Sequence, residues 1–201
     1  NGESPMPVIA ASSPTDCFDA AYMACKIALE HMTPVVLLTD AYIANGSAAW
    51  RLPDLAEYPD IRPPYVTPDM AGAWTPFQRN PQTGVRYWAT PGMEGFMHRI
   101  GGLEKSNETG AISTEPENHF LMTKLRAEKV EKIADSLPPL TVEGNPDADL
   151  LIVGFGGTYG HLHSAMDQLN AMGKKAALAH FRVINPLPKN TAEVLRKYKT
   201  I

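Results

Sequence analysis

The sequence predicts an α/β fold with two parallel-sheet units, one near each end of the chain, joined by a long irregular connector. Three observations support this prediction: two strand–helix–strand patterns, and between them a stretch rich in proline and aromatic residues. Parallel strands need a long crossover connection, which an α-helix usually supplies. Each crossover is therefore expected to be helical and right-handed.

The first unit contains apolar runs at residues 6–11 and 35–38, which are typical of buried parallel strands. Between them, Ser13, Pro14 and Asp16 form a helix-start signal, because serine caps a helix and proline fits its first turn. Apolar residues then recur with helical periodicity at Phe18, Ala21, Tyr22, Cys25, Ala28, Leu29 and Met32.

The second unit repeats the pattern, with strands expected at residues 150–153 and 176–181. The helix between them is expected to bury Leu162, Ala165, Met166, Leu169 and Met172. Gly173 is placed to end this helix, because glycine readily adopts the left-handed conformation of a C-cap. A turn at residues 185–188 and a short helix at 190–198 complete the unit.

The connector is rich in both prolines and aromatic residues. Its eight prolines are Pro53, Pro59, Pro63, Pro64, Pro68, Pro76, Pro81 and Pro91. In or beside it lie Trp50, Tyr58, Tyr65, Trp74, Phe77, Tyr87, Trp88 and Phe96. Each aromatic can bury on the order of 150–250 Å², so we expect an ordered segment packed on this chain or another subunit, rather than a disordered linker. A helix over residues 116–134 follows.

Composition excludes several classes of protein. The net charge of −4 argues against a nucleic-acid partner, which would require a basic face. No apolar run approaches the roughly 18 residues of a membrane span, and the start at Asn1 is unlike a signal peptide and suggests a piece of a longer chain. Cys17 and Cys25 lie about 12 Å apart along one expected helix and cannot pair there. Two reduced thiols suit the cytosol, and without a Cys-x-x-Cys motif this chain is not expected to ligate an iron–sulfur cluster alone.

Residues 154–160 form a glycine-rich turn between a strand and a helix. The turn departs from G-x-G-x-x-G because Tyr159 stands at the third glycine. We interpret it as a tight turn that needs glycine for its backbone geometry, with anion binding at the helix N-terminus as the alternative. His161 and His163 point about 200° apart on that helix, so they are not expected to share a metal.

Four residues are candidates for a site. Asp40 and Asn45 follow the second strand, and ligands in open α/β sheets bind beyond the carboxyl ends of strands; the alternative for Asp40 is a turn cap. Glu104 and Asn107 lie in a polar, glycine-bounded loop at residues 98–110. Its composition fits either a mobile loop at an interface or a plain connector.

Four segments, at residues 40–47, 99–105, 116–119 and 185–190, together resemble the α subunit of 2-oxoacid:ferredoxin oxidoreductases, most closely the 2-oxoglutarate type. The resemblance implies that residues 1–48 end a pyrimidine-type thiamine-fold domain. Residues 49–139 would be a connector with one helix, and residues 140–201 would begin a transketolase C-terminal-like domain.

The resemblance also implies a hetero-oligomeric, cytoplasmic enzyme that is not active through this chain alone. It would decarboxylate a 2-oxoacid to an acyl-CoA and pass electrons to ferredoxin. Thiamine diphosphate, Mg²⁺ and a [4Fe-4S] cluster would be held mainly by a β subunit, none of them wholly by this chain. The alternatives are a non-catalytic assembly module, or a subunit of a pyruvate-type oxidoreductase or a transketolase-like enzyme.

The family's Tyr-Pro-Ile-Thr-Pro motif and its cofactor-activating glutamate do not occur in the sequence. In such relatives the loop at residues 103–108 approaches the active site, which makes Glu104 and Asn107 expected neighbours of that site. Many relatives read Leu-Glu-His-Asp-Glu there, and Lys105 and Asn107 depart from this pattern.

Overall fold

The computed structural model describes residues 3–99 and 101–201; Asn1, Gly2 and Ile100, which fall in the expected N-terminal segment and polar loop, lie outside the described residues. The chain divides into two compact units. The sheet unit comprises Met6–Cys25, Pro34–Pro59 and Ala134–Ile201. The loop unit comprises Asn1–Pro5, Lys26–Thr33 and Asp60–Ile133.

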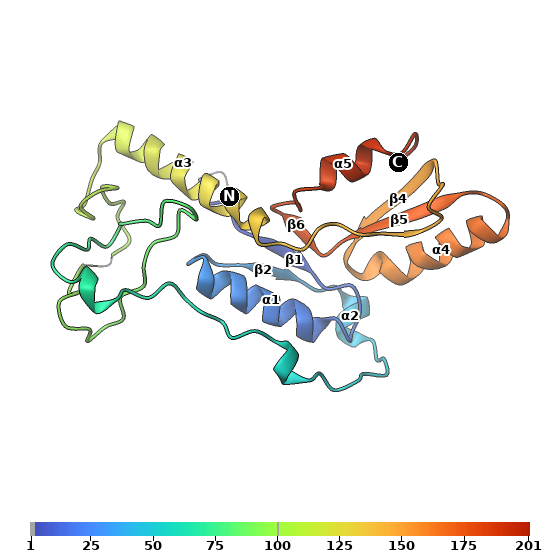
Figure 1. The fold of residues 1–201 in the computed structure, drawn as a ribbon, viewed down its shortest axis with the longest axis horizontal. Coiled ribbons are helices and arrows are strands. Elements are labelled where there is room, and N and C mark those ends of the chain that lie inside the picture. The colour runs from blue at the N-terminus through green and yellow to red at the C-terminus, as the bar shows by residue number, and fades with distance from the viewer. Residues whose placement is uncertain (1–2, 100) are drawn as a thin grey trace. The chain divides into compact units, whose positions relative to one another are not determined.

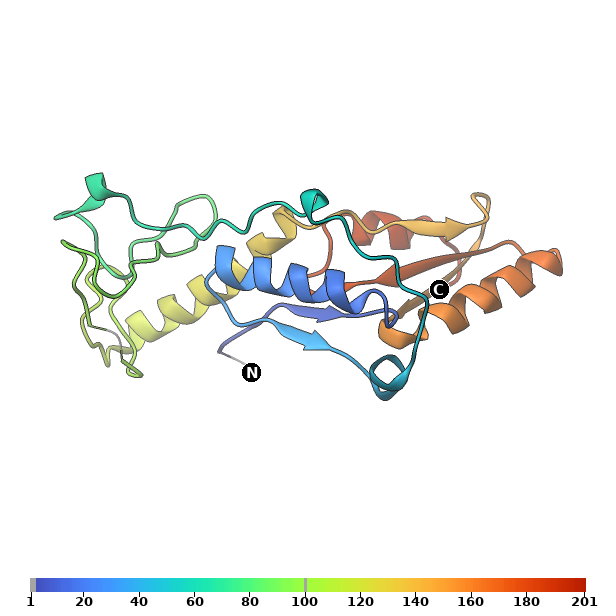
Figure 2. The ribbon, with the colours of Figure 1, turned by 90° about the horizontal axis from the view of Figure 1, so that it is seen from below.

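The first sheet of the sheet unit has the order β2-β1-β6. Strands β1 (Val8–Ala10) and β2 (Val36–Leu38) are parallel, with Val8 opposite Val36, and helix α1 (Cys17–Glu30) connects them. This confirms the first strand–helix–strand prediction, and Figure 2 shows α1 running beside the two strands. The helix begins later than expected, because residues 13–16 form a turn in which Ser13 Oγ accepts a hydrogen bond from the Asp16 backbone at 3.1 Å.

The second sheet has the order β3-β5-β4. Strands β4 (Leu150–Phe155) and β5 (Ala176–Phe181) are parallel over six residues. A 3-10 turn at Gly156–Thr158 leads into helix α4 (Tyr159–Ala171), and helix α5 (Thr191–Arg196) follows later. The second strand–helix–strand prediction is therefore also confirmed.

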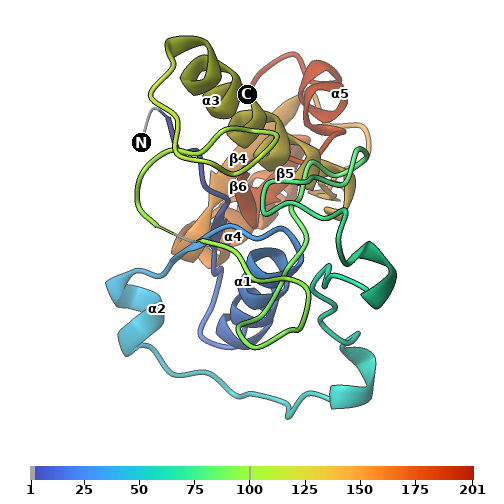
Figure 3. The same ribbon diagram turned by 90° about the vertical axis from the view of Figure 1, so that its left-hand side faces the viewer.

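Helices α4 and α5 cover opposite faces of the second sheet (Figure 1), and the side view in Figure 3 keeps β4 and β5 between them. Alternate residues of β5 explain this arrangement, because successive side chains of a strand point to opposite faces. Ala176 and Leu178 pack with Met166 of α4. Ala177 and Ala179 pack with residues on the other face, including Val194 of α5.

The two sheets confirm the α/β class and the parallel pair in each unit, and each sheet also carries one antiparallel edge strand that the sequence did not predict. Strand β6 (Val183–Asn185) runs antiparallel to β1, where a turn was expected to begin. Strand β3 (Val142–Gly144) runs antiparallel to β5. Each of these edge strands has three residues, too few to give a readable alternation. The predicted domain boundaries at residues 48 and 139 stay a prediction.

The connector is ordered in both units. In the sheet unit it includes a 3-10 turn at Leu55–Glu57, and helix α2 (Ala41–Asn45) lies just before it in the sequence. There the Tyr58 ring lies 4.9 Å from Tyr22 and 5.5 Å from Phe18, both on α1.

The loop unit has little regular structure apart from helix α3 (Pro116–Lys132), as the green segment in Figure 2 shows. A short 3-10 turn occurs at Pro68–Met70, and another, at Ile133–Asp135, begins at the last residue of the unit. Its buried side chains include Val66, Val85, Phe96, Met122 and Val130. Of the connector's aromatic residues Phe96 is buried and packs on Trp74, whereas Tyr65 is about half exposed, so the packing expected from the sequence rests as much on Val66 and Val85 as on aromatic rings. The helix expected at residues 116–134 is confirmed.

Candidate functional site

A cavity of about 630 Å³ lies where the carboxyl ends of four strands of the sheet unit converge. Ala11 follows β1, Thr39 and Asp40 follow β2, and Phe181 ends β5. The glycine turn at residues 154–158 follows β4 and forms the remaining wall. This is where an open α/β sheet usually binds its ligand, and the structure places Asp40 on it.

Asp40 has a structural role that one of its two carboxylate oxygens fulfils. Oδ1 accepts a hydrogen bond from the Ile43 backbone at 2.8 Å and so caps helix α2. Oδ2 lies so close to Gly157 that a Cβ atom at that position would overlap it. Asp40 therefore caps helix α2, as the capping alternative expected, and the residue also lines the cavity.

Asn45 does not line the cavity. Its side-chain amide donates to the Ala41 carbonyl at 2.9 Å within α2. Asn45 therefore supports the end of a short helix, and a role at a site stays a prediction.

The glycine turn has the geometry expected of a tight strand-to-helix connection. Gly156 has a φ of +63°, which favours glycine. A Cβ atom at Gly154 would overlap the Leu162 side chain of α4. Thr158 Oγ1 donates to the Phe155 carbonyl at 2.6 Å and closes the turn.

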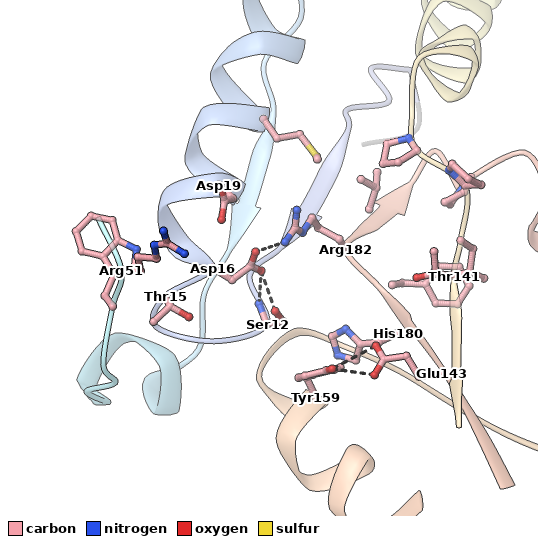
Figure 4. A pocket seen from close by; sticks show the side chains of 18 of the residues that line it. Ser12, Thr15, Asp16, Asp19, Arg51, Thr141, Glu143, Tyr159, His180 and Arg182 are labelled. Atoms are coloured by element: carbon pink, nitrogen blue, oxygen red, sulfur yellow. Dashed lines mark hydrogen bonds and ion pairs between the residues drawn. The ribbon is translucent and has the colours of Figure 1, made fainter. Parts of the chain in front are cut away.

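A second cavity of the sheet unit, of about 710 Å³, is lined by polar side chains that come together from distant parts of the sequence (Figure 4). Asp16 is only 7% exposed, and its carboxylate pairs with Arg182. The same carboxylate accepts hydrogen bonds from the Ser12 backbone at 2.8 Å and from the Ser12 hydroxyl at 2.9 Å. This network fixes the segment between β1 and α1 against the segment between β5 and β6.

The other polar group of this cavity centres on His180. Its Nε2 is buried without a hydrogen-bond partner among the described residues, and burial lowers the pKa of His180. The Tyr159 ring lies 5.1 Å away, edge to face, and the Tyr159 hydroxyl donates to Glu143 Oε2 at 3.0 Å. A neutral imidazole beside a phenol could hold or accept a proton there. This group could not be predicted from the sequence, because its members lie on three separate elements, β3, α4 and β5.

Glu104 and Asn107 belong to a separate polar cluster in the loop unit. Glu104 accepts hydrogen bonds from His119 Nδ1 at 2.5 Å and from Arg126 at 3.0 Å. Burial acts to raise the pKa of Glu104, but these two hydrogen bonds outweigh it and lower the pKa. Asn107 Oδ1 accepts from Arg79 Nε at 3.3 Å. The loop is thus tied to its own unit by ionic contacts.

Residues 3–99 and 101–201 contain no group of three or more His, Cys, Asp or Glu side chains that could hold a metal ion. Cys17 and Cys25 are both free thiols on α1. His163 lies 3.2 Å from Asp167, whereas the His161 ring packs on a tyrosine, so the two histidines face different partners. In the same described segments, every helix is too short or too polar to cross a membrane.

Comparison with known proteins gives a consistent result. The sequence profile of the family described as pyruvate flavodoxin/ferredoxin oxidoreductase, thiamine diphosphate-binding, matches residues 2–118. The 2-oxoglutarate oxidoreductase subunit KorA of Mycobacterium tuberculosis is 45% identical over 202 residues, which cover 100% of this chain and 30% of that protein. Subunit alpha of 2-oxoacid:ferredoxin oxidoreductase 1 of Aeropyrum pernix is 29% identical, covering 98% of this chain and 31% of that protein.

A solved structure shares the fold. The 2-oxoglutarate:ferredoxin oxidoreductase from Magnetococcus marinus, with 2-oxoglutarate, coenzyme A and succinyl-CoA bound, superposes with a TM-score of 0.84 at 25% identity. The match covers 100% of this chain and 34% of the other. The chain thus spans about a third of the length of these relatives. Since the family profile matches more than half of its residues, the chain belongs to the pyruvate flavodoxin/ferredoxin oxidoreductase family, through its thiamine diphosphate-binding domain.

Proposed function

We propose that this chain is part of the α subunit of a 2-oxoglutarate:ferredoxin oxidoreductase. The enzyme would decarboxylate 2-oxoglutarate oxidatively, form succinyl-CoA and pass two electrons to ferredoxin. The observation that carries the proposal is the 45% identity, over the whole chain, to a subunit named for 2-oxoglutarate oxidation. The solved relative with 2-oxoglutarate and coenzyme A bound supports the same substrate pair.

The proposal assigns the cofactors mainly to a β subunit within a hetero-oligomer. Mg²⁺ prefers carboxylate and carbonyl oxygen ligands beside the phosphates it binds, and the described residues offer no such group of carboxylates. The residues present therefore do not fit the metal–diphosphate end of thiamine diphosphate, nor a [4Fe-4S] cluster, which needs four thiolates. Accordingly, no reaction step is assigned to these groups within this chain.

The part that this chain would take is to shape and shield the site. The strand-end cavity is largely apolar, with Leu38, Val153 and Leu162 among its lining residues, so it would exclude water from a bound group. Asp40 is held in place there by its helix cap. Asp40, Asn45, Glu104 and Asn107 remain the proposed site-proximal residues, with ferredoxin and coenzyme A as co-substrates of the complex. Free thiols at Cys17 and Cys25 support a cytosolic location.

The test uses the full-length subunit purified with its partner. The measurement is 2-oxoacid- and CoA-dependent reduction of ferredoxin, with thiamine and iron content determined in parallel. We expect kcat/KM for 2-oxoglutarate to exceed that for pyruvate at least tenfold. A preference for pyruvate would replace the proposal with the pyruvate-type alternative. The proposal would be overturned by a complex that contains thiamine and iron but does not reduce ferredoxin with any of the 2-oxoacids tested.

A further inference from the structure

An exposed segment of the sheet unit, residues 46–55, connects helix α2 to the 3-10 turn that begins at Leu55, and we call it the arm. Every residue from Gly46 to Leu52 is exposed. Figures 1 and 3 both show the arm as an arc that runs outside helix α1. The arm is therefore a surface feature along its whole length.

The backbone of the arm is extended and has no internal partner. Gly46 and Asp54, at its two ends, have φ values of −78° and −81° with extended ψ values. In the part of the chain that the structure describes, no hydrogen bond involves the backbone of residues 47–53. The N–H and C=O groups of this stretch are thus free to bind another chain.

The arm carries large apolar side chains that stay exposed. Leu52 is 78% exposed, Leu55 is 70% exposed and Trp50 is 49% exposed. Trp50 has one ring contact, with its centre 5.9 Å from that of Phe18 on α1. Flexible connectors are usually built of small and polar residues, whereas exposed apolar side chains gathered in one place mark interaction sites. The composition of the arm is that of an interaction site.

Both ends of the arm are fixed to the sheet unit, so its apolar side chains are presented at a defined place. Before the arm, Asp40 caps helix α2. After it, Asp54 Oδ1 accepts a hydrogen bond from the Ala56 backbone at 3.0 Å, and the Tyr58 hydroxyl donates to Asp19 of α1. Anchoring of this kind lowers the entropic cost of binding.

The arm also carries an unpaired cation among its apolar side chains. Arg51 is exposed, and it lines the polar cavity of Figure 4 without pairing with a carboxylate there. The arginine ion pairs of the described residues involve Arg62, Arg126 and Arg182 instead. Tryptophan and arginine are enriched among the residues that dominate binding energy at interfaces. Charge complementarity therefore requires a carboxylate beside the apolar surface that the arm meets.

We propose that the arm docks into an apolar groove of the partner subunit, with Leu52 and Leu55 in the groove and Arg51 paired with a carboxylate at its rim. Extended segments are one of the forms in which chains are recognised by grooves and sheet edges. The partner is the β subunit of the complex, so the inference rests on the subunit arrangement of the proposed function.

The first test is hydrogen exchange in peptides that cover residues 46–55 of the full-length subunit, alone and assembled with its partner. Because its backbone lacks hydrogen bonds, the arm should exchange rapidly in the subunit alone and about tenfold or more slowly in the complex. Equal rates in the two states would overturn the proposal. Slow exchange in the subunit alone would also overturn it, by assigning the arm to another part of that subunit or, if the rate depends on concentration, to a second copy.

The second test is the dissociation rate of the assembled subunits. Leu52→Ser should raise this rate by roughly tenfold, because a leucine side chain is no longer buried in the groove. Arg51→Ser should raise it as well, and Arg51→Lys should restore part of the loss. Exchange in peptides of α1 verifies that each variant is folded.

Leu187→Ser is the matched control, because Leu187 is an exposed leucine of the same unit that lies outside the arm. It should change the dissociation rate by less than about twofold. A Leu52→Ser effect no larger than that of this control would overturn the proposal.

Neither measurement needs turnover, so the inference and the proposed function can fail separately. A complex that protects the arm but oxidises no 2-oxoacid would keep the inference and reject the proposed function. An active complex in which the arm exchanges as rapidly as in the subunit alone would reject the inference and keep the function.

Discussion

Replacing Lys129 by methionine should stabilise the loop unit at neutral pH. Lys129 lies on α3, where burial and then the charges of Arg86, Arg79 and Arg126 lower its pKa from 10.5 to about 8. At 1.36 kcal/mol for each pKa unit, this corresponds to about 3 kcal/mol of stability lost when the ammonium form is buried. Methionine has a similar length and no charge.

The sign of the pH dependence follows from proton binding. Between pH 8 and 10.5 the unfolded chain keeps the Lys129 proton while the folded chain releases it, so stability rises with pH in this window. Below pH 8 the cost is present in full. The substitution also removes the hydrogen bond from Lys129 Nζ to the Met32 carbonyl at 2.8 Å, worth about 1 kcal/mol. The net gain should be about 2 kcal/mol at pH 7 and close to zero at pH 9.5.

The assay is the urea dependence of hydrogen exchange in peptides that cover α3, measured on the full-length subunit at both pH values. Lys124→Met is the matched control, because Lys124 lies on the same helix with its side chain 63% exposed and paired to Glu128 at 3.7 Å. The control should change stability by less than about 0.5 kcal/mol at either pH. Destabilisation by Lys129→Met at pH 7, or an effect that is equal at pH 7 and 9.5, would refute the reasoning.

Three further predictions concern single contacts. Asp16→Ala should lower the free energy of unfolding by roughly 2–3 kcal/mol in urea titrations, because removing this almost buried carboxylate leaves Arg182 and the Ser12 backbone N–H without their partner. A loss below about 0.5 kcal/mol would contradict this. Gly157→Ala should cost about 1–3 kcal/mol by overlap with the Asp40 carboxylate, and a double-mutant cycle with Asp40→Ala should show less than additive losses. The Glu104 hydrogen bond raises the pKa of His119, so the stability from this ion pair is lost as the pH rises through the raised pKa. An NMR titration of His119 should show a midpoint above the ordinary histidine value, and Glu104→Gln should lower that midpoint. A midpoint that Glu104→Gln leaves unchanged would count against the pair.

The sequence predicted those elements whose signals are local. The periodic apolar residues of α1 and α4, the buried run of β5 and the proline at the start of α3 each describe their own segment. Gly173 was predicted to end α4, and its φ of +76° agrees. The three-residue strands β3 and β6 carried no such signal, because their pairing is decided by partners far along the chain.

The candidate site likewise includes residues that could be predicted from the sequence and residues that could not. Asp40 could be placed at a strand end because the rule for ligand sites in open sheets needs only the position of the strand. The pairing of Asp16 with Arg182 joins residues 166 positions apart, and no spacing rule reaches that far. The cavity of the loop unit that Trp74, Arg86 and Lys105 line could not be predicted from the sequence either, because its walls come from loops without periodicity.

Strand β1 has a consequence for the order in which the protein can be made. Strand β2, on one side of β1, is complete at residue 38. Strand β6, on the other side, pairs its Asn185 with Val8 of β1. The ribosome delivers the N-terminus first, so one edge of β1 stays unpaired while nearly the whole segment is translated. An unpaired strand edge is a template for association with other chains. A nascent chain stalled before Val183 should therefore bind chaperones more strongly than one of full length, in which β6 has paired with β1.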